Sequence, residues 1–164
     1  MILSIRSGRP VEKKEVARVD EFSVLLVDDE REFLDTLIKR LQKRELKVTG
    51  VTSGEEALRI LKETPPDVVV LDVRMEGMDG IQTLREIKKV NPLVEVIMLT
   101  GHANLEVAVE GMEVGAFDYL MKPMDIDELL YKLEDAYKRK TIQEQKIKHL
   151  QEGKKVPSPL VGEG

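Results

Sequence analysis

Two apolar patterns alternate along residues 22–137 of the chain. Short apolar runs are typical of strands buried on both faces, and apolar residues at every third or fourth position are typical of helices with one buried face. The runs predict strands over residues 22–27, 46–51, 68–71, 94–99 and 116–121. The repeats predict helices over 31–44, from Ser53 to the Pro65-Pro66 pair, over 80–90, over 104–113 and from Asp125 onward.

This alternation predicts the fold class. Strands that alternate with helices imply right-handed βα crossovers and therefore a parallel sheet with helices on both faces. We therefore expect an α/β fold, a doubly wound five-stranded parallel sheet with a long C-terminal helix. In such folds the binding site lies at the carboxyl ends of the strands, where the strand order reverses.

The pattern also predicts the division of the chain. Residues 1–21 are polar and aperiodic and are interpreted as a flexible leader, and 22–137 form the predicted domain. Residues 138–152 continue the last helix as an extension or linker, and 153–164, rich in turn-forming residues, are interpreted as a disordered tail.

Composition narrows the function class. The net charge of −5 argues against a protein that binds nucleic acid through a basic surface. Cysteine is absent, which excludes disulfides, thiol catalysis and thiolate metal sites. The apolar runs are too short to span a membrane, and the first residues do not form a signal peptide. We therefore predict a cytoplasmic protein with no membrane partner.

Polar side chains follow four of the predicted strands. Asp28 and Asp29 follow the first strand, Asp72 the third, Thr100 the fourth and Lys122 the fifth. Clustered carboxylates repel one another unless a cation joins them, and an all-oxygen set favours Mg²⁺. A site that combines Mg²⁺, an ammonium and a hydroxyl suits phosphoryl oxygens, and a carboxylate can be the nucleophile. Each residue alone could be a cap or turn residue; their joint placement favours function.

Five motifs carry a resemblance. The chain resembles the response-regulator receiver family of two-component signalling, whose fold is flavodoxin-like. The Thr100-Gly101-His102-Ala103 motif and the long basic last helix look like those of receivers that precede ATPase-type transcription activators. The motifs, in order, are Val24–Glu30, Asp67–Met75, Gly77–Gly80, Met98–Ala103 and Gly115–Pro123.

The resemblance implies a role for each carboxylate. Asp72 would accept a phosphoryl group from the phosphohistidine of a sensor histidine kinase or phosphotransfer protein. Asp29 would bind Mg²⁺ directly and Asp28 through water, with Asp72 and the backbone carbonyl of Arg74 completing the protein ligands.

The resemblance also implies a switch. Lys122 would pair with the phosphoryl oxygens, Thr100 would move to bind them, and Tyr119 would swing inward, which changes the surface offered to a downstream partner. Arg74 and His102 occupy positions that tune hydrolysis of the phosphoryl group. Because Arg74 has no side-chain carbonyl to orient water, we expect slow autodephosphorylation. Tyr119 could instead be a plain strand aromatic, and His102 an exposed loop residue.

Two other functions are open. A phosphatase with an Asp nucleophile usually carries a second Asp two residues later, where this chain has Arg74. A scaffold with an inactive site usually lacks one of the acidic residues or the Lys, and all are present here. We therefore expect a self-phosphorylating switch and not a turnover enzyme.

The last helix raises the question of self-association. A three-four repeat continues past residue 137 in what is either a dimerising coiled coil or linker, or a solvated helix. A homodimer is a candidate partner, formed by weak self-association through this helix or through the face of the fourth helix, fifth strand and fifth helix. Specific DNA binding is not expected because no DNA-binding element follows. The repeat comprises Ile126, Leu129, Leu133, Ala136, Lys140, Gln143, Ile147 and Leu150.

Overall fold

Five parallel strands form one sheet in the order β3-β2-β4-β5-β6. The computed structural model describes residues 22–75, 78–101 and 105–153. The strands are β2 (Ser23–Val27), β3 (Lys47–Val51), β4 (Val68–Asp72), β5 (Glu95–Thr100) and β6 (Asp118–Met121). The helices are α1 (Arg31–Gln42), α2 (Gly54–Glu63), α3 (Gly80–Val90), α4 (Leu105–Val114) and α5 (Ile126–Gln151).

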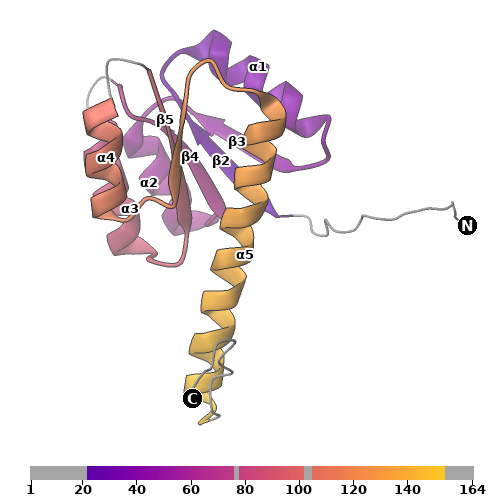
Figure 1. Cartoon of the computed structure of the whole chain (residues 1–164), viewed down its shortest axis with the longest axis vertical. Coiled ribbons are helices and arrows are strands. Elements are labelled where there is room, and N and C mark those ends of the chain that lie inside the picture. The colour runs from indigo at the N-terminus through magenta and orange to yellow at the C-terminus, as the bar shows by residue number, and fades with distance from the viewer. Residues whose placement is uncertain (1–21, 76–77, 102–104, 154–164) are drawn as a thin grey trace, which may run out of the picture.

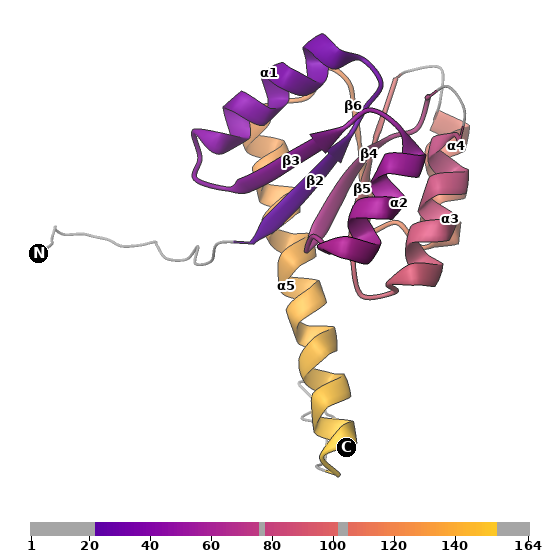
Figure 2. The same cartoon turned by 180° about the vertical axis from the view of Figure 1, so that it is seen from behind.

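Helices cover both faces of the sheet (Figures 1 and 2). Alternate residues of β2 show the division, because side chains of a strand alternate between its faces. Val24 and Leu26 pack in one apolar cluster with residues of α1 and α5. Leu25 and Val27 pack in the other with residues of α2, α3 and α4. The predicted α/β fold, a flavodoxin-like doubly wound sheet with a long C-terminal helix, is confirmed.

The strand order reverses between β2 and β4. From β2 the chain continues outward to β3, whereas from β4 it continues in the other direction to β5 and β6. The carboxyl ends of β2 and β4 therefore lie side by side at the point where a doubly wound sheet binds its ligand. Asp28 follows the first of these strands and Asp72 ends the second.

Side-chain capping differs between the helices. Ser53 caps α2, because its Oγ accepts a hydrogen bond from the Glu56 N–H at 3.1 Å. Asp125 occupies the N-cap position of α5, but its side chain makes no capping bond to the described residues. α1 ends at Gln42, two residues before the predicted end, and Glu45 in the following turn has φ of 68°.

The first turns of the α5 extension are bound to the domain. The ring of Tyr137 stacks on that of Phe22 with centroids 4.7 Å apart. Lys140 donates a hydrogen bond of 3.0 Å to Asp67. Beyond them α5 projects from the sheet (Figure 1), and Ile142, Ile147 and Leu150 are exposed. None of the described helices has both the length and the apolar character needed to cross a membrane. The predicted leader, residues 1–21, and residues 154–164 of the predicted tail lie outside the described residues.

Candidate functional site

The sheet register brings the predicted site residues together at the carboxyl ends of the strands. Val27 pairs with Leu71, so the residues that follow them, Asp28 and Asp72, are neighbours. Asp72 in turn pairs with Leu99, directly before Thr100. Thr100 pairs with Met121, directly before Lys122. The convergence expected from the strand ends is thus present in the structure.

Three carboxylates form an acidic cluster at this point. Oxygens of Asp28, Asp29 and Asp72 all lie within 4.8 Å of one another. Asp28 and Asp72 are buried, with exposed fractions of 2% and 6%, whereas Asp29 is exposed. Two backbone amides hold the buried pair: the Glu30 N–H donates to Asp28 Oδ1 at 2.9 Å and the Arg74 N–H to Asp72 Oδ1 at 3.4 Å.

Lys122 brings a positive charge to this cluster. Its Nζ donates to Asp28 Oδ2 at 2.9 Å and to Glu30 Oε1 at 3.5 Å. Asp72 Oδ1 lies 3.7 Å from the same nitrogen, within ion-pair range. The Lys122–Pro123 peptide bond is cis. The ammonium is therefore shared among carboxylates of three different strand and helix ends.

Burial disfavours the charged form of the two buried carboxylates. Burial, and then the neighbouring charge of Asp28, raise the pKa of Asp72 to about 6. Burial also raises the pKa of Asp28, although the Glu30 amide and Lys122 partly offset it. Burial alone would lower the pKa of Lys122, but the hydrogen bond to Asp28 and the charge of Asp72 raise it. A bound cation would relieve the repulsion between the carboxylates.

The residues present fit a hard divalent cation. The donors that converge are carboxylate oxygens, one of them exposed, so an ion could be held while it keeps several waters. Mg²⁺ prefers such a partly hydrated site with one or two carboxylates. Asp28, Asp29 and Asp72 could therefore hold a metal.

The predicted switch residues lie on adjacent strands. Thr100 is fully buried at the end of β5, and its Oγ1 donates to the Gly101 carbonyl at 3.2 Å. Tyr119 on β6 pairs with Met98, is half-buried and packs against the cluster of α2, α3 and α4. Movement of either residue is untested and stays a prediction.

A backbone contact joins the residue after Asp72 to the start of α3. The Gly80 N–H donates to the Val73 carbonyl, and a Cβ at Gly80 would lie 2.5 Å from the Val73 Cα. Only glycine allows this approach. The Arg74 side chain is exposed on this loop. The other predicted tuning residue, His102, lies outside the described residues.

Two contacts of the site were missed by the sequence analysis. Glu30 occupies the N-cap position of α1 but turns its carboxylate to Lys122. Phe33, in the first turn of α1, places its ring 4.2 Å from the Lys122 Nζ. Phe33 belongs to the apolar repeat of the helix predicted over 31–44, and that repeat indicates only a residue that faces the core. Its position one turn after the end of the first strand was the feature that could have placed it near the site.

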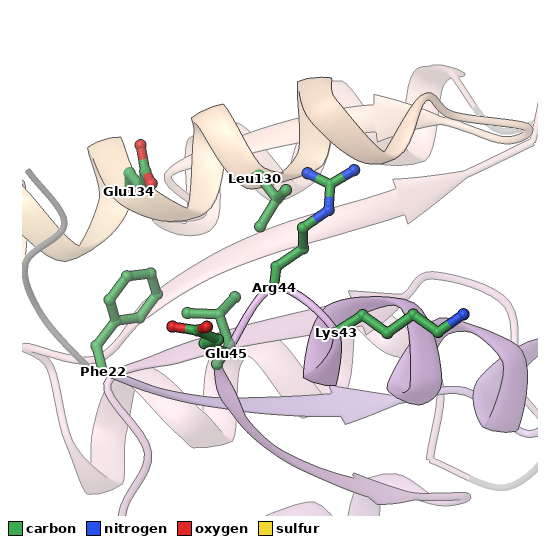
Figure 3. A pocket seen from close by; sticks show the side chains of 7 residues that line it. Phe22, Lys43, Arg44, Glu45, Leu130 and Glu134 are labelled. Carbon is green, nitrogen blue, oxygen red and sulfur yellow. The ribbon is translucent and has the colours of Figure 1, made fainter. Parts of the chain in front are cut away.

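A separate pocket lies between the start of β2, the turn from α1 to β3, and α5 (Figure 3). Its volume is about 340 Å³, and it combines an apolar floor with charges of both signs. None of its lining residues is a predicted site residue, so it is distinct from the acidic cluster. They are Phe22, Lys43, Arg44, Glu45, Leu46, Leu130 and Glu134.

Comparison with known proteins now adds to this geometry. The family model described as response regulator receiver domain matches residues 24–134. The chain belongs to the response regulator receiver family. This match confirms the resemblance drawn from the five motifs, and it covers the acidic cluster and the strands except for Ser23.

Similar receivers occur in transcription regulators. The transcriptional regulatory protein ZraR of Escherichia coli K12 is 42% identical over 117 residues, which are 71% of this chain and 26% of that protein. The DNA-binding transcriptional regulator NtrC of the same strain is 42% identical over 69% of this chain and 24% of its own length. The chain thus spans about a quarter of the length of these curated relatives.

Solved receivers share the fold. A receiver domain protein from Clostridium thermocellum is 37% identical with a TM-score of 0.72, over 74% of this chain and 98% of that one. The receiver domain of NtrX from Brucella abortus is 33% identical with a TM-score of 0.68, over 70% of this chain and 98% of that one.

Proposed function

We propose that this receiver accepts a phosphoryl group on Asp72 and thereby switches its surface for a downstream partner. The observation that supports this most is the position of the Asp72 carboxylate. It lies buried beside Asp28 and Asp29, with the Lys122 ammonium 3.7 Å away. A nucleophile, a candidate cation site and a positive charge therefore meet at one point, which is what phosphoryl transfer requires.

The proposed donor is the phosphohistidine of a sensor histidine kinase or phosphotransfer protein. An Asp72 oxygen forms the new bond to phosphorus while the bond from phosphorus to the imidazole nitrogen breaks, and the imidazole leaves with the electron pair and takes up a proton. Asp28, Asp29, Asp72 and the Arg74 carbonyl would hold Mg²⁺. When bound, Mg²⁺ neutralises charge on the phosphoryl oxygens.

The remaining residues stabilise and report the modification. Lys122 pairs with a phosphoryl oxygen, for which its ammonium moves from Asp28 toward Asp72. Thr100 donates its hydroxyl to another oxygen, and Tyr119 follows by turning inward. Both lie on neighbouring strands, β5 and β6. The change at the surface of α4 and β6 is what a downstream partner would detect.

We further propose a cytoplasmic, slowly dephosphorylating switch and not a turnover enzyme. Arg74 stands where an Asp-nucleophile phosphatase usually carries its acid–base Asp, and its side chain is exposed. Neither Arg74 nor His102 offers the side-chain carbonyl that would orient a water. A phosphoryl half-life of only seconds for the purified protein with Mg²⁺ would contradict slow hydrolysis.

The decisive experiment is incubation of the full chain with Mg²⁺ and acetyl phosphate, followed by intact mass measurement. We expect a single stable phosphoryl adduct in the wild type and none in Asp72→Ala. Continuous release of phosphate at many turnovers would favour a phosphatase. A wild-type protein that binds Mg²⁺ without any adduct would favour a scaffold that works unphosphorylated.

A further inference from the structure

The Lys122 ammonium lies over an aromatic ring. Its Nζ is 4.2 Å from the centroid of Phe33, a half-buried residue in the first turn of α1 that packs against the core of the α1 and α5 face. Eighty-nine positions separate the two residues, and the sheet topology brings them together. An ammonium at this distance is attracted by the negative face of the ring.

The ring acts on the cation differently from the surrounding acids. Asp28 and Glu30 accept N–H bonds from Lys122, which must be given up before the ammonium can serve another oxygen. A ring attracts the charge without a lone pair of comparable strength, so the N–H groups stay available. The attraction also varies little with small displacements, so the ammonium can shift toward Asp72, 3.7 Å away, while it stays over the ring.

Lysine needs such support. Its ammonium is a point charge on a flexible four-carbon stem, and ordering the side chain costs conformational entropy. The stem of Lys122 is one-fifth exposed, so water competes for the ammonium. The Phe33 ring covers one side of it and narrows its range of positions to those near the carboxylates.

We infer that Phe33 is a positioning residue for phosphoryl transfer, which holds the Lys122 ammonium over its ring within reach of the phosphoryl oxygens on Asp72. This inference rests on the proposed function, because it assigns how one group of that site is aligned. Phe33 touches no reacting atom; it acts through Lys122 alone.

The test measures phosphorylation of the full chain by acetyl phosphate with saturating Mg²⁺. A small donor needs no docking surface, so loss of a kinase contact on α1 cannot produce the effect. Phe33→Leu removes the ring and should lower the phosphorylation rate constant about fivefold. Phe33→Tyr keeps the ring and should restore the wild-type rate. Phe33→Met, flexible and without a ring, replaces Phe33→Leu if that variant does not fold.

Phe117→Leu is the matched control. Phe117 is also half-buried and also carries a cation on its ring, Arg139 at 5.7 Å, but it lies before β6 at the far end of the sheet. The same loss of a ring–cation contact there should leave the rate unchanged. Proton NMR adds a direct signature: the methylene shifts of Lys122 next to Nζ should lose their ring-current displacement in Phe33→Leu and keep it in Phe33→Tyr.

The outcomes separate the two proposals. Wild-type phosphorylation with an equal rate in Phe33→Leu overturns the positioning role alone. An equal loss of rate in Phe33→Leu and Phe33→Tyr also overturns it, because the ring would then not be the cause. A wild type that is never phosphorylated overturns the proposed function and this inference together.

Discussion

Each end of the sheet has at least one buried carboxylate, but the cations beside the carboxylates are arranged differently. At the carboxyl ends of the strands, Asp28, Glu30 and Asp72 share the single ammonium of Lys122. At the amino ends, Asp67 is bonded to Lys140 at 3.0 Å, and Glu95 lies 3.3 Å from Arg139. We call these the carboxyl end and the amino end.

The difference separates a binding site from a structural contact. At the amino end Asp67 also accepts hydrogen bonds from the amide and hydroxyl of Ser23, and Glu95 has a second cation, Lys88, at 4.0 Å. The carboxylates there form ion pairs with cations of the same chain. At the carboxyl end burial and mutual repulsion raise the pKa of Asp72 to about 6. Buried carboxylates that repel one another form a site that a metal and a phosphoryl group can complete.

The largest expected effect is on metal binding at the carboxyl end. Asp29→Ala removes a full charge from the cluster and should weaken Mg²⁺ binding about a hundredfold, roughly 3 kcal/mol. Isothermal titration calorimetry of the full chain checks this. Glu63→Ala, which removes an exposed acid on α2 that pairs with Arg59, is the control and should not change the affinity. Equal weakening in both variants would mean that general charge, and not the cluster, binds the ion.

The next effect concerns stability at the amino end. Lys140→Met leaves the Asp67 carboxylate without its ammonium, and the Lys140 side chain is only 12% exposed. We expect a loss of about 2 kcal/mol in the free energy of unfolding, measured by urea denaturation. In the double variant with Asp67→Asn the two changes should be less than additive. Full additivity would show that the pair is not coupled.

At the carboxyl end, removing a charge should instead increase the free energy of unfolding. Without Mg²⁺ at pH 7.5, Asp72→Asn should raise the free energy of unfolding by about 1–2 kcal/mol. The pKa of Asp72 is higher in the folded state, about 6, than the ordinary value of 3.8. Protonation therefore stabilises the fold fully below the ordinary value, and this stabilisation is lost as the pH rises through about 6.

Urea denaturation at several pH values distinguishes this charge effect from improved packing. The gain from Asp72→Asn should shrink as the pH falls from 7.5 to 4.5, because the wild-type carboxyl becomes neutral too. Saturating Mg²⁺ should reduce or reverse it, because the ion binds the wild-type site. A gain that does not depend on pH would contradict charge repulsion at this end.

The smallest expected effect concerns an exposed ion pair, which serves as a reference for the effects at the two ends of the sheet. Arg44 and Asp127 form an ion pair of 2.9 Å that belongs to neither end, and their side chains are 43% and 72% exposed. Solvent screens such a pair, so Arg44→Ala should change the free energy of unfolding by less than about 0.5 kcal/mol. Urea denaturation checks this as well, and a loss as large as that of Lys140→Met would show that burial is not what distinguishes the amino-end pair.

The backbone position of the site followed from the sequence. The apolar runs ending at Val27 and Leu71 identified two strand ends, and a parallel sheet must place such ends along one side. Asp28, Asp72, Thr100 and Lys122 could therefore be assembled from their positions alone. The cap at Ser53 was predictable for a different reason: its bond to Glu56 joins residues that are close in the sequence.

Side-chain partners were less predictable. Lys122 bonds to Asp28 at 2.9 Å, lies 3.7 Å from Asp72 and lies 4.2 Å from the ring centroid of Phe33, and these contacts depend on its rotamer. Lys140 belongs to the three-four repeat that could form a coiled coil, but its ammonium pairs with Asp67 of its own domain. A helical period tells which residues share a face, and not what covers that face. The homodimer accordingly stays a prediction.

Helix α5 has a geometric consequence. It is one continuous helix from Ile126 to Gln151, and Lys140 and Arg139 fix it to the amino end. Each residue of a helix advances about 1.5 Å and turns about 100°. The angular position of Gln151 around the helix axis is therefore set by the number of residues after Lys140. One inserted residue would rotate everything beyond it by roughly a quarter turn, whereas seven would nearly restore the angle.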